Sequence, residues 1–162
     1  MTENADREGP DPAALAADAD VLAADLFVDG DARAALDVVR AHDWVTLVAS
    51  EPLLDDAEAV VAALGDDDLA TDWRENVEAL ATVVEHPAGD HPALSAAVRG
   101  NAAHVLSLDD RLQSAAAGAA LSGRVDVSVK SPAAFARLFD PEVLYPTVVG
   151  GEYPGPDRDP RE

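Results

Sequence analysis

The sequence contains no cysteine and no isoleucine, and it has a single lysine, Lys130, among its 162 residues. Without cysteine, a disulfide-linked scaffold, a zinc site built from thiolates and a cysteine nucleophile are all excluded. No apolar run approaches the ~20 residues that a membrane-spanning helix requires, so we expect no membrane partner. Glu3, Asp6 and Glu8 stand where a secretory signal would be basic, and we therefore expect a cytoplasmic protein.

Basic side chains are scarce as well, because 11 Lys and Arg face 32 Asp and Glu, which gives a net charge of −21. Taken literally, this charge disfavours nucleic acid, since phosphate binding normally needs a basic face, and we expect no readout of DNA sequence. Yet 48% of the residues are hydrophobic, whereas disordered acidic chains are poor in apolar residues. An Asp-rich, almost lysine-free composition resembles proteins of extreme halophiles, where molar salt shortens the Debye length to ~3 Å. The positions of individual acids are then more informative than the net charge.

One domain is predicted between two polar ends of the chain. Residues 1–11 are polar and have no periodicity, so we expect a disordered acidic arm. Residues 146–162 are rich in proline, glycine and charge, and we expect them to form a tail. Residues 12–145 are long enough for a single domain with its own core.

Within this domain, short apolar segments alternate with segments of helical periodicity. Strands are expected at residues 13–19, 44–49, 81–85, 104–107 and 125–129. Helices are expected at residues 31–41, after Ser50, at residues 67–80, after Asp90, from Asp109 or Asp110 to Gly123, and after Ser131, the last with Phe135, Leu138 and Phe139 inside. The composition of residues 13–19 suits a strand poorly, and they could instead join residues 21–27 in a helix. The alternation predicts a three-layer α/β/α fold with a parallel sheet of about five strands.

Four aspartates fall at or near the ends of these strands. Asp18 ends the first strand, Asp90 starts a helix and Asp109 directly follows the fourth strand. Asp56 lies one turn into the helix after the second strand, at the edge of its apolar face, while Asp55 points away. In a doubly wound sheet, ligands gather beyond the carboxyl ends of the strands. Converging carboxylates repel unless a cation lies between them, and hard oxygen ligands suit Mg²⁺ or Mn²⁺, as in metal-assisted phosphodiester hydrolysis.

Each of these acids also has an ordinary structural interpretation. Aspartate is a favoured N-cap, so Asp90 or Asp109 taken alone is more readily a cap than a ligand, and Asp56 a residue of a solvated helix face. The constellation of four acids, and not any one of them, supports a metal site. The histidines lack the H-x-x-x-H spacing of a zinc site; they are His42, His86, His91 and His104.

The order of these motifs resembles the PIN-domain family of metal-dependent ribonucleases, which includes many toxin-type enzymes. The sequence DADVL at residues 18–22 occupies the place of the family's D-T-N-x-L motif, with Asp20 where the family has Asn. The sequence SEPLLDD at residues 50–56 matches an S-x-x-L-L-x-E helix start, with Asp56 in place of Glu.

The resemblance continues to about residue 139. The sequence DHPAL at residues 90–94 fits a D-x-x-x-L pattern. The sequence SLDDRL at residues 107–112 fits T-G-D-x-x-L, with Ser107 for Thr and Leu108 for Gly. The sequence VSVKSPAAF at residues 127–135 matches the closing strand and an S-P-x-x-F helix start.

The resemblance implies a Mg²⁺- or Mn²⁺-dependent endoribonuclease that acts on RNA, with an antitoxin-type protein partner and a homodimer. It assigns catalysis and metal binding to Asp18, Asp56, Asp90 and Asp109, and contact with the substrate to Ser107 and Asp20. Three departures from the family pattern favour an alternative, namely a catalytically weak or inactive PIN-like module that binds a protein or RNA; they are Asp20, Asp56 and Leu108. A third hypothesis is an acid-coated structural domain without a site.

Overall fold

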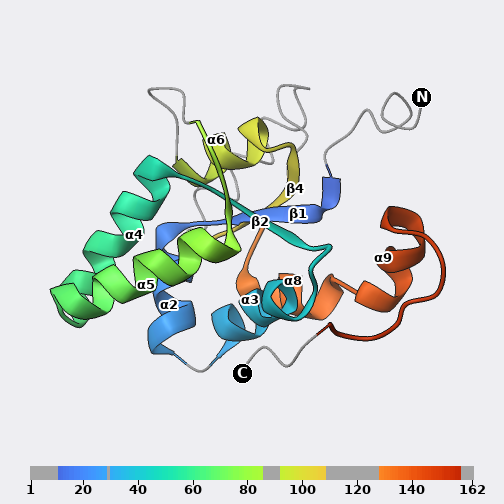
Figure 1. Ribbon diagram of the computed structural model, residues 1–162, viewed down its shortest axis with the longest axis horizontal. Helices are drawn as coiled ribbons and strands as arrows, with labels where there is room; N and C mark the ends of the chain where they lie inside the picture. The colour runs from blue at the N-terminus through green and yellow to red at the C-terminus, as the bar shows by residue number, and fades with distance from the viewer. Residues whose placement is uncertain (1–10, 29, 86–91, 109–127, 158–162) are drawn as a thin grey trace.

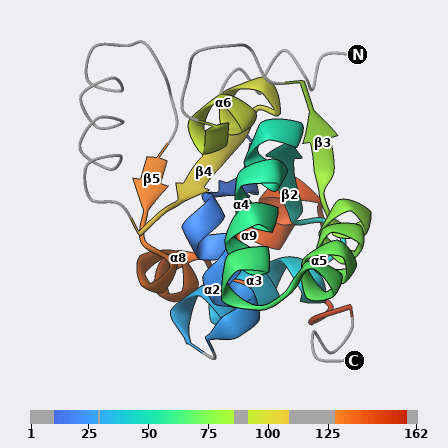
Figure 2. The ribbon, with the colours of Figure 1, turned by 90° about the vertical axis from the view of Figure 1, so that its left-hand side faces the viewer.

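The computed structural model describes residues 11–28, 30–85, 92–108 and 128–157, which form an α/β protein around a five-stranded sheet (Figures 1 and 2). All strand pairs are parallel, and the strand order is β3-β2-β1-β4-β5. The strands are β1 (Asp11–Ala17), β2 (Thr46–Ser50), β3 (Thr82–Val84), β4 (Ala102–Leu106) and β5 (Ser128–Lys130). The predicted three-layer α/β/α fold with a parallel sheet is therefore confirmed.

Helices lie on both sides of this sheet. In the described ranges they are α2 (Ala19–Phe27), α3 (Asp31–Ala41), α4 (Glu51–Leu64), α5 (Asp67–Leu80), α6 (Pro92–Arg99), α8 (Pro132–Leu138) and α9 (Pro141–Val148). Helix α6 lies above the sheet in Figures 1 and 2, whereas α3 and α8 lie below it, where they contact each other. Helix α4 contacts α2 and α5. None of the helices in these ranges has the length and the hydrophobicity to cross a membrane.

The starts of several helices follow from local capping. The Ser50 hydroxyl accepts the N–H of Leu53 at 3.4 Å, with proline in the first turn of α4. The Ser131 hydroxyl accepts the N–H of Ala134 at 3.1 Å at the start of α8. Both caps were predicted, because a side-chain oxygen at this position satisfies an N–H that has no partner within the helix.

The core lies where the apolar strands meet the helices. Leu15, Leu47 and Val105 of the three central strands are fully buried, as expected for a sheet covered on both faces. Phe135 of α8 is buried too, but Leu138 is 67% exposed, which corrects its predicted place inside the domain. Leu138 is the last residue of α8, and its side chain lies outside the face of the helix that contacts the core.

The C-terminal segment contacts the domain beyond residue 145. Helix α9 runs through to Val148, and the Tyr153 hydroxyl lies 2.6 Å from Nε2 of the buried His42. The N–H of Asp157 donates to the carbonyl of Ala41 at 2.7 Å. Residues 146–157, which their composition assigned to a tail, are therefore in contact with the domain. Residues 1–10 and 158–162 lie outside the described ranges.

Candidate functional site

Asp18 lies between the central strand β1 and helix α2. Its backbone is extended, and its Oδ1 accepts the N–H of Ala19 at 2.8 Å. Its own N–H donates to the carbonyl of Leu106, the last residue of β4, at 2.8 Å. The half-buried carboxylate is therefore tied by its backbone to the carboxyl end of the neighbouring strand.

Ser107 follows β4 directly and is completely buried. Its hydroxyl donates to Oδ2 of Asp18 at 3.0 Å. Its N–H donates to the carbonyl of Lys130, the last residue of β5, at 3.1 Å. The Ala19 N–H donates to Oδ1 of Asp18 and the Ser107 hydroxyl to Oδ2, and both bonds help to orient the carboxylate.

This pair of residues occupies the point where the strand order changes direction. From β1 the chain builds β2 and β3 on one side, and β4 and β5 on the other. In open parallel sheets, ligands bind beyond the carboxyl ends of the strands at such a switch point. Asp18 and Ser107 stand at the ends of β1 and β4, the two strands that flank it.

Of the other predicted site residues, the structure describes only Asp56 and Asp20. Asp56 is exposed on α4 and makes no hydrogen bond or ion pair with any residue of the described ranges. Asp20 lies half-buried in the first turn of α2. Asp90 and Asp109 lie outside the described residues. Within the ranges described, no three His, Cys, Asp or Glu side chains form a group that could hold a metal ion.

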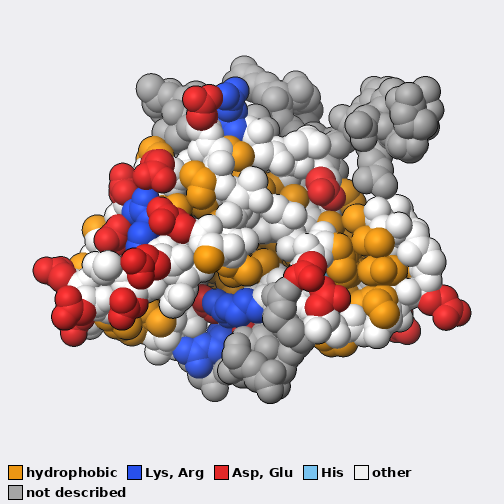
Figure 3. All heavy atoms as spheres, in the orientation of Figure 1, with side chains coloured by type: hydrophobic (Ala, Val, Ile, Leu, Met, Phe, Trp, Pro, Cys, Tyr) orange, Lys and Arg blue, Asp and Glu red, His pale blue; other side chains and the backbone are white. Residues whose placement is uncertain are grey.

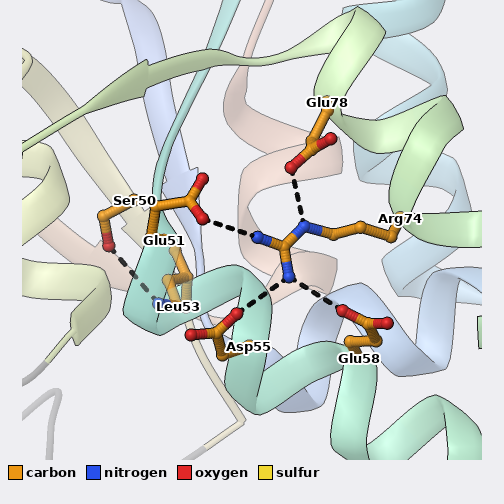
Figure 4. Close-up of polar contacts among 7 residues, drawn as sticks. All are labelled: Ser50, Glu51, Leu53, Asp55, Glu58, Arg74 and Glu78. Carbon is orange, nitrogen blue, oxygen red and sulfur yellow. Dashed lines mark hydrogen bonds and ion pairs between the residues drawn. The ribbon is translucent and has the colours of Figure 1, made fainter. Parts of the chain in front are cut away.

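Asp55, the neighbour of Asp56, belongs to a surface ion-pair network that we call the Arg74 cluster (Figure 4). The Arg74 guanidinium of α5 pairs with four carboxylates, three from α4 and one from its own helix: Glu51 at 3.1 Å, Asp55 at 3.0 Å, Glu58 at 2.8 Å and Glu78 at 2.8 Å. Burial lowers the pKa of Arg74, but the hydrogen bonds to Asp55 and Glu78 outweigh it, so that its pKa is raised. Figure 3 shows acidic side chains gathered around basic atoms over α4 and α5.

The Arg74 cluster is not predicted from the sequence, although the spacing of the acids in the sequence contains a signal for it. Glu51, Asp55 and Glu58 are spaced four and three residues apart, which places them on one stripe of a helix. Asp55 is expected to point away from the site, and its side chain is indeed 66% exposed on α4, where it pairs with Arg74 at 3.0 Å. A stripe of acids on a helix therefore marks the contact with the next helix and not the metal site.

The Arg74 cluster and the Asp18–Ser107 pair show two different surroundings for carboxylates in this acidic chain. In the first, a guanidinium of the protein pairs with the carboxylates, and in the second the Ala19 N–H and the Ser107 hydroxyl donate to Asp18. No curated protein and no solved structure matches the sequence. The model of DUF7384, described as a family of unknown function, matches residues 9–161, almost the whole length. The chain therefore belongs to the DUF7384 family.

Proposed function

We propose that this protein is a divalent-metal-dependent ribonuclease of the PIN-like type, which hydrolyses phosphodiester bonds in RNA. The observation that carries the proposal is the hydrogen bond between Ser107 and Asp18 at the switch point between β1 and β4. The resemblance to PIN domains assigns metal binding to Asp18 and contact with the substrate to Ser107. The two residues are 89 positions apart in the sequence, and their hydrogen bond at the ends of β1 and β4 supports the proposal.

The donor chemistry of the proposed site suits Mg²⁺ or Mn²⁺. Asp18, Asp90 and Asp109 would hold the ion, with Asp56 contributing through water, and all of their donor atoms are hard oxygens. Such an ion, when bound, lowers the pKa of a water molecule and stabilises the charge that develops on the phosphate. The absence of cysteine from the sequence is compatible with this oxygen-only set.

The protein's own contribution is to position the Asp18 carboxylate. The Ala19 N–H and the Ser107 hydroxyl donate to different oxygens of that carboxylate. Such partners orient a metal ligand before the ion arrives, and their removal typically costs about 10–100-fold in metal affinity or activity. Ser107 is buried and held by its backbone to β5, so its hydroxyl has little freedom to turn away. We therefore assign Ser107 a positioning role in this site.

The wider parts of the proposal come from sequence expectations: the resemblance implies the substrate and the partners, the acidic N-terminus suggests the location, and the composition suggests the environment. These parts are RNA as the substrate, an antitoxin-type protein partner, a homodimer, a location in the cytoplasm and the salt-rich environment of a halophile. The alternative is a PIN-like module that binds RNA or a protein without cleaving it. Asp56 favours this alternative, because it is exposed and bound to no other described residue.

The test is cleavage of single-stranded RNA in molar KCl with and without Mn²⁺. Asp18→Asn keeps the shape of the side chain but removes its charge, and we expect it to abolish cleavage. Ser107→Ala should lower the rate about 10–100-fold, and raising the Mn²⁺ concentration should restore part of that loss, because the carboxylate itself is still present. Divalent ions should also raise the melting temperature of the wild type more than that of Asp18→Asn, since they bind the folded state.

Asp72→Asn is the matched control. Asp72 is exposed on α5 and forms no hydrogen bond or ion pair within the described ranges, so its variant should match the wild type. Asp55→Asn would be a poor control, because Asp55 is paired with Arg74. Equal cleavage by the wild type and Asp18→Asn would overturn the site. RNA binding without cleavage by any variant would instead establish the alternative of a non-cleaving module.

A further inference from the structure

A second site is suggested by a pocket of about 260 Å³ between the β4–β5 end of the sheet and helices α8 and α9. Most of its lining is apolar, and hydrophobic side chains are visible over α9 in Figure 3. The lining residues of apolar type are Pro12, Phe135, Leu138, Phe139, Val143 and Leu144. The volume is slightly below the ~300–1,000 Å³ of sites for drug-sized ligands. The pocket therefore suits a small molecule with an apolar body.

Three polar residues also line this pocket, namely His104, Asp140 and Lys130, the only lysine of the chain. Lys130 is half-buried, and its Nζ donates to Nδ1 of His104 at 2.9 Å. Burial lowers the pKa of Lys130. In the described part of the chain Lys130 forms no ion pair with any carboxylate, although the protein has 32 acids.

The neighbours of Lys130 do not compensate its charge. Nε2 of His104 donates to the carbonyl of Pro12 at 3.0 Å, which leaves Nδ1 as an acceptor and the ring neutral. Burial and the charge of Lys130 both lower the pKa of His104. Asp140 also lines the pocket, where its Oδ1 accepts the N–H groups of Glu142 and Val143, but no ion pair joins it to Lys130. The pocket thus combines an ammonium group with apolar walls.

We propose that this pocket binds a small amphipathic carboxylate, whose acid group accepts a hydrogen bond from Lys130 and whose apolar body lies against Phe135, Phe139 and Val143. An ammonium group has three donors, and His104 uses one of them. Partial burial of an unpaired cation is costly, and an anionic ligand offsets that cost. The proposal does not rest on ribonuclease activity, because neither Asp18 nor Ser107 lines this pocket.

The single lysine makes a direct binding assay practical. Protein that carries ¹³C-labelled lysine gives one Cε resonance, which can be followed during titration with hexanoate in KCl at pH 7. Hexan-1-ol supplies the same apolar body without the charge, and acetate supplies the charge with little apolar body. We expect a saturable shift with hexanoate, and binding at least tenfold tighter than with either comparison compound. Equal affinity for hexanoate and hexan-1-ol, or no saturable shift with hexanoate, would overturn the proposal.

Variants test the two halves of the pocket separately, with calorimetry as the readout. Lys130→Met keeps an apolar side chain and should weaken hexanoate binding at least tenfold. Val143→Asp adds a negative charge at a wall residue that is 70% exposed, and it should weaken hexanoate binding more than hexan-1-ol binding. Val149→Asp is the matched control, because Val149 is exposed and does not line the pocket. Hexanoate binding that is unchanged in Lys130→Met, or equally affected by Val143→Asp and Val149→Asp, would exclude this site.

Discussion

Two arginines pair with carboxylates that differ in their exposure to solvent. Arg74 contacts four carboxylates whose side chains are between 36% and 66% exposed. Arg40 of α3 contacts Asp37 at 2.9 Å and Asp25 of α2, and Asp25 is only 6% exposed. Exposed ion pairs contribute about 0–1 kcal/mol each, whereas removing one partner of a buried pair costs about 3–5 kcal/mol. The burial of the partners, and not their number, therefore decides how much each arginine matters.

Ionising the carboxyl group of Asp25 in the folded protein is costly. Burial raises its pKa, and the hydrogen bond and charge of Arg40 offset only part of this effect. Its Oδ1 is buried and has no hydrogen-bond partner in the described part of the chain. Because its pKa is higher in the folded state than in the unfolded chain, the contribution of Asp25 to stability is largest at low pH and falls as the pH rises through the folded-state pKa.

The largest effect should follow from removing the cation of the buried pair. Arg40→Met leaves the Asp25 carboxylate without its main partner, and we expect a loss of about 3 kcal/mol in the free energy of unfolding. The double variant Asp25→Leu with Arg40→Met should recover most of this loss, because an apolar pair replaces an ionic one. Urea unfolding in high salt measures both values. A double variant no more stable than Arg40→Met would show that packing, and not the charge of Asp25, causes the loss.

The C-terminal contact should have the next largest effect. Removing residues 150–162 takes the Tyr153 hydroxyl away from the buried His42, and with it the ring contact between Tyr153 and Tyr145. We expect a loss of about 2 kcal/mol, since a buried polar group loses its partner. Tyr153→Phe keeps the ring and should lose about 1 kcal/mol. Removing residues 158–162 alone is the control, because it keeps these contacts. Equal losses of stability for the two truncations, measured by thermal unfolding, would contradict the prediction.

Arg74→Met should cost less than either change, in spite of its four partners. We expect a loss of about 1 kcal/mol in low salt and a smaller one in molar KCl, because salt screens exposed charges. Arg99→Met tests an isolated exposed pair, in which Arg99 lies 3.4 Å from Glu85, and it should have no measurable effect. The measurement is the free energy of unfolding of each variant in low salt and in molar KCl. A loss larger than that of Arg40→Met, or one that grows with salt, would reverse the comparison.

The smallest effect concerns the pH dependence contributed by His104. Its pKa is lower in the folded protein than the usual 6.5, so the unfolded chain takes up its proton first as the pH falls. The contribution of His104 to the free energy of unfolding has its full value above pH 6.5 and is lost as the pH drops below that value. His104→Phe removes this titration, and the difference in unfolding free energy between wild type and variant should narrow from pH 8 to pH 5. A constant difference, or a pKa above 6.5 for His104 by NMR, would contradict the assignment.

Much of the fold could be predicted because its signals are local. The helices at residues 31–41 and 67–80 have the predicted bounds, since helical periodicity repeats within four residues. Ser50 and Ser131 cap the helices that follow them. The first strand expected at residues 13–19 is present as β1 at Asp11–Ala17, whereas Ala19 already begins helix α2.

The candidate site could be predicted only in part. Asp18 and Ser107 were recognised separately from their motifs, but no local pattern shows that their side chains touch. Asp56 matches a motif, yet it is exposed on α4 and forms no hydrogen bond or ion pair with a described residue. Motif matching assigns a residue to a position in the chain, whereas the sheet order and the helix orientations decide which side chains converge.

The sequence by itself determined the five strands, most of the described helices and the caps Ser50 and Ser131, because hydrophobic periodicity and capping act between residues a few positions apart. It did not predict α9, and the helix expected from Asp109 or Asp110 to Gly123 lies outside the described residues. The tertiary structure alone decided that Asp25 is buried beside Arg40, that Arg74 joins α4 to α5, and that Lys130 faces His104 in an apolar pocket. These contacts join residues 15, 16 and 26 positions apart. They depend on the packing of whole helices and strands, which sets both the distance between two charges and their exposure to water.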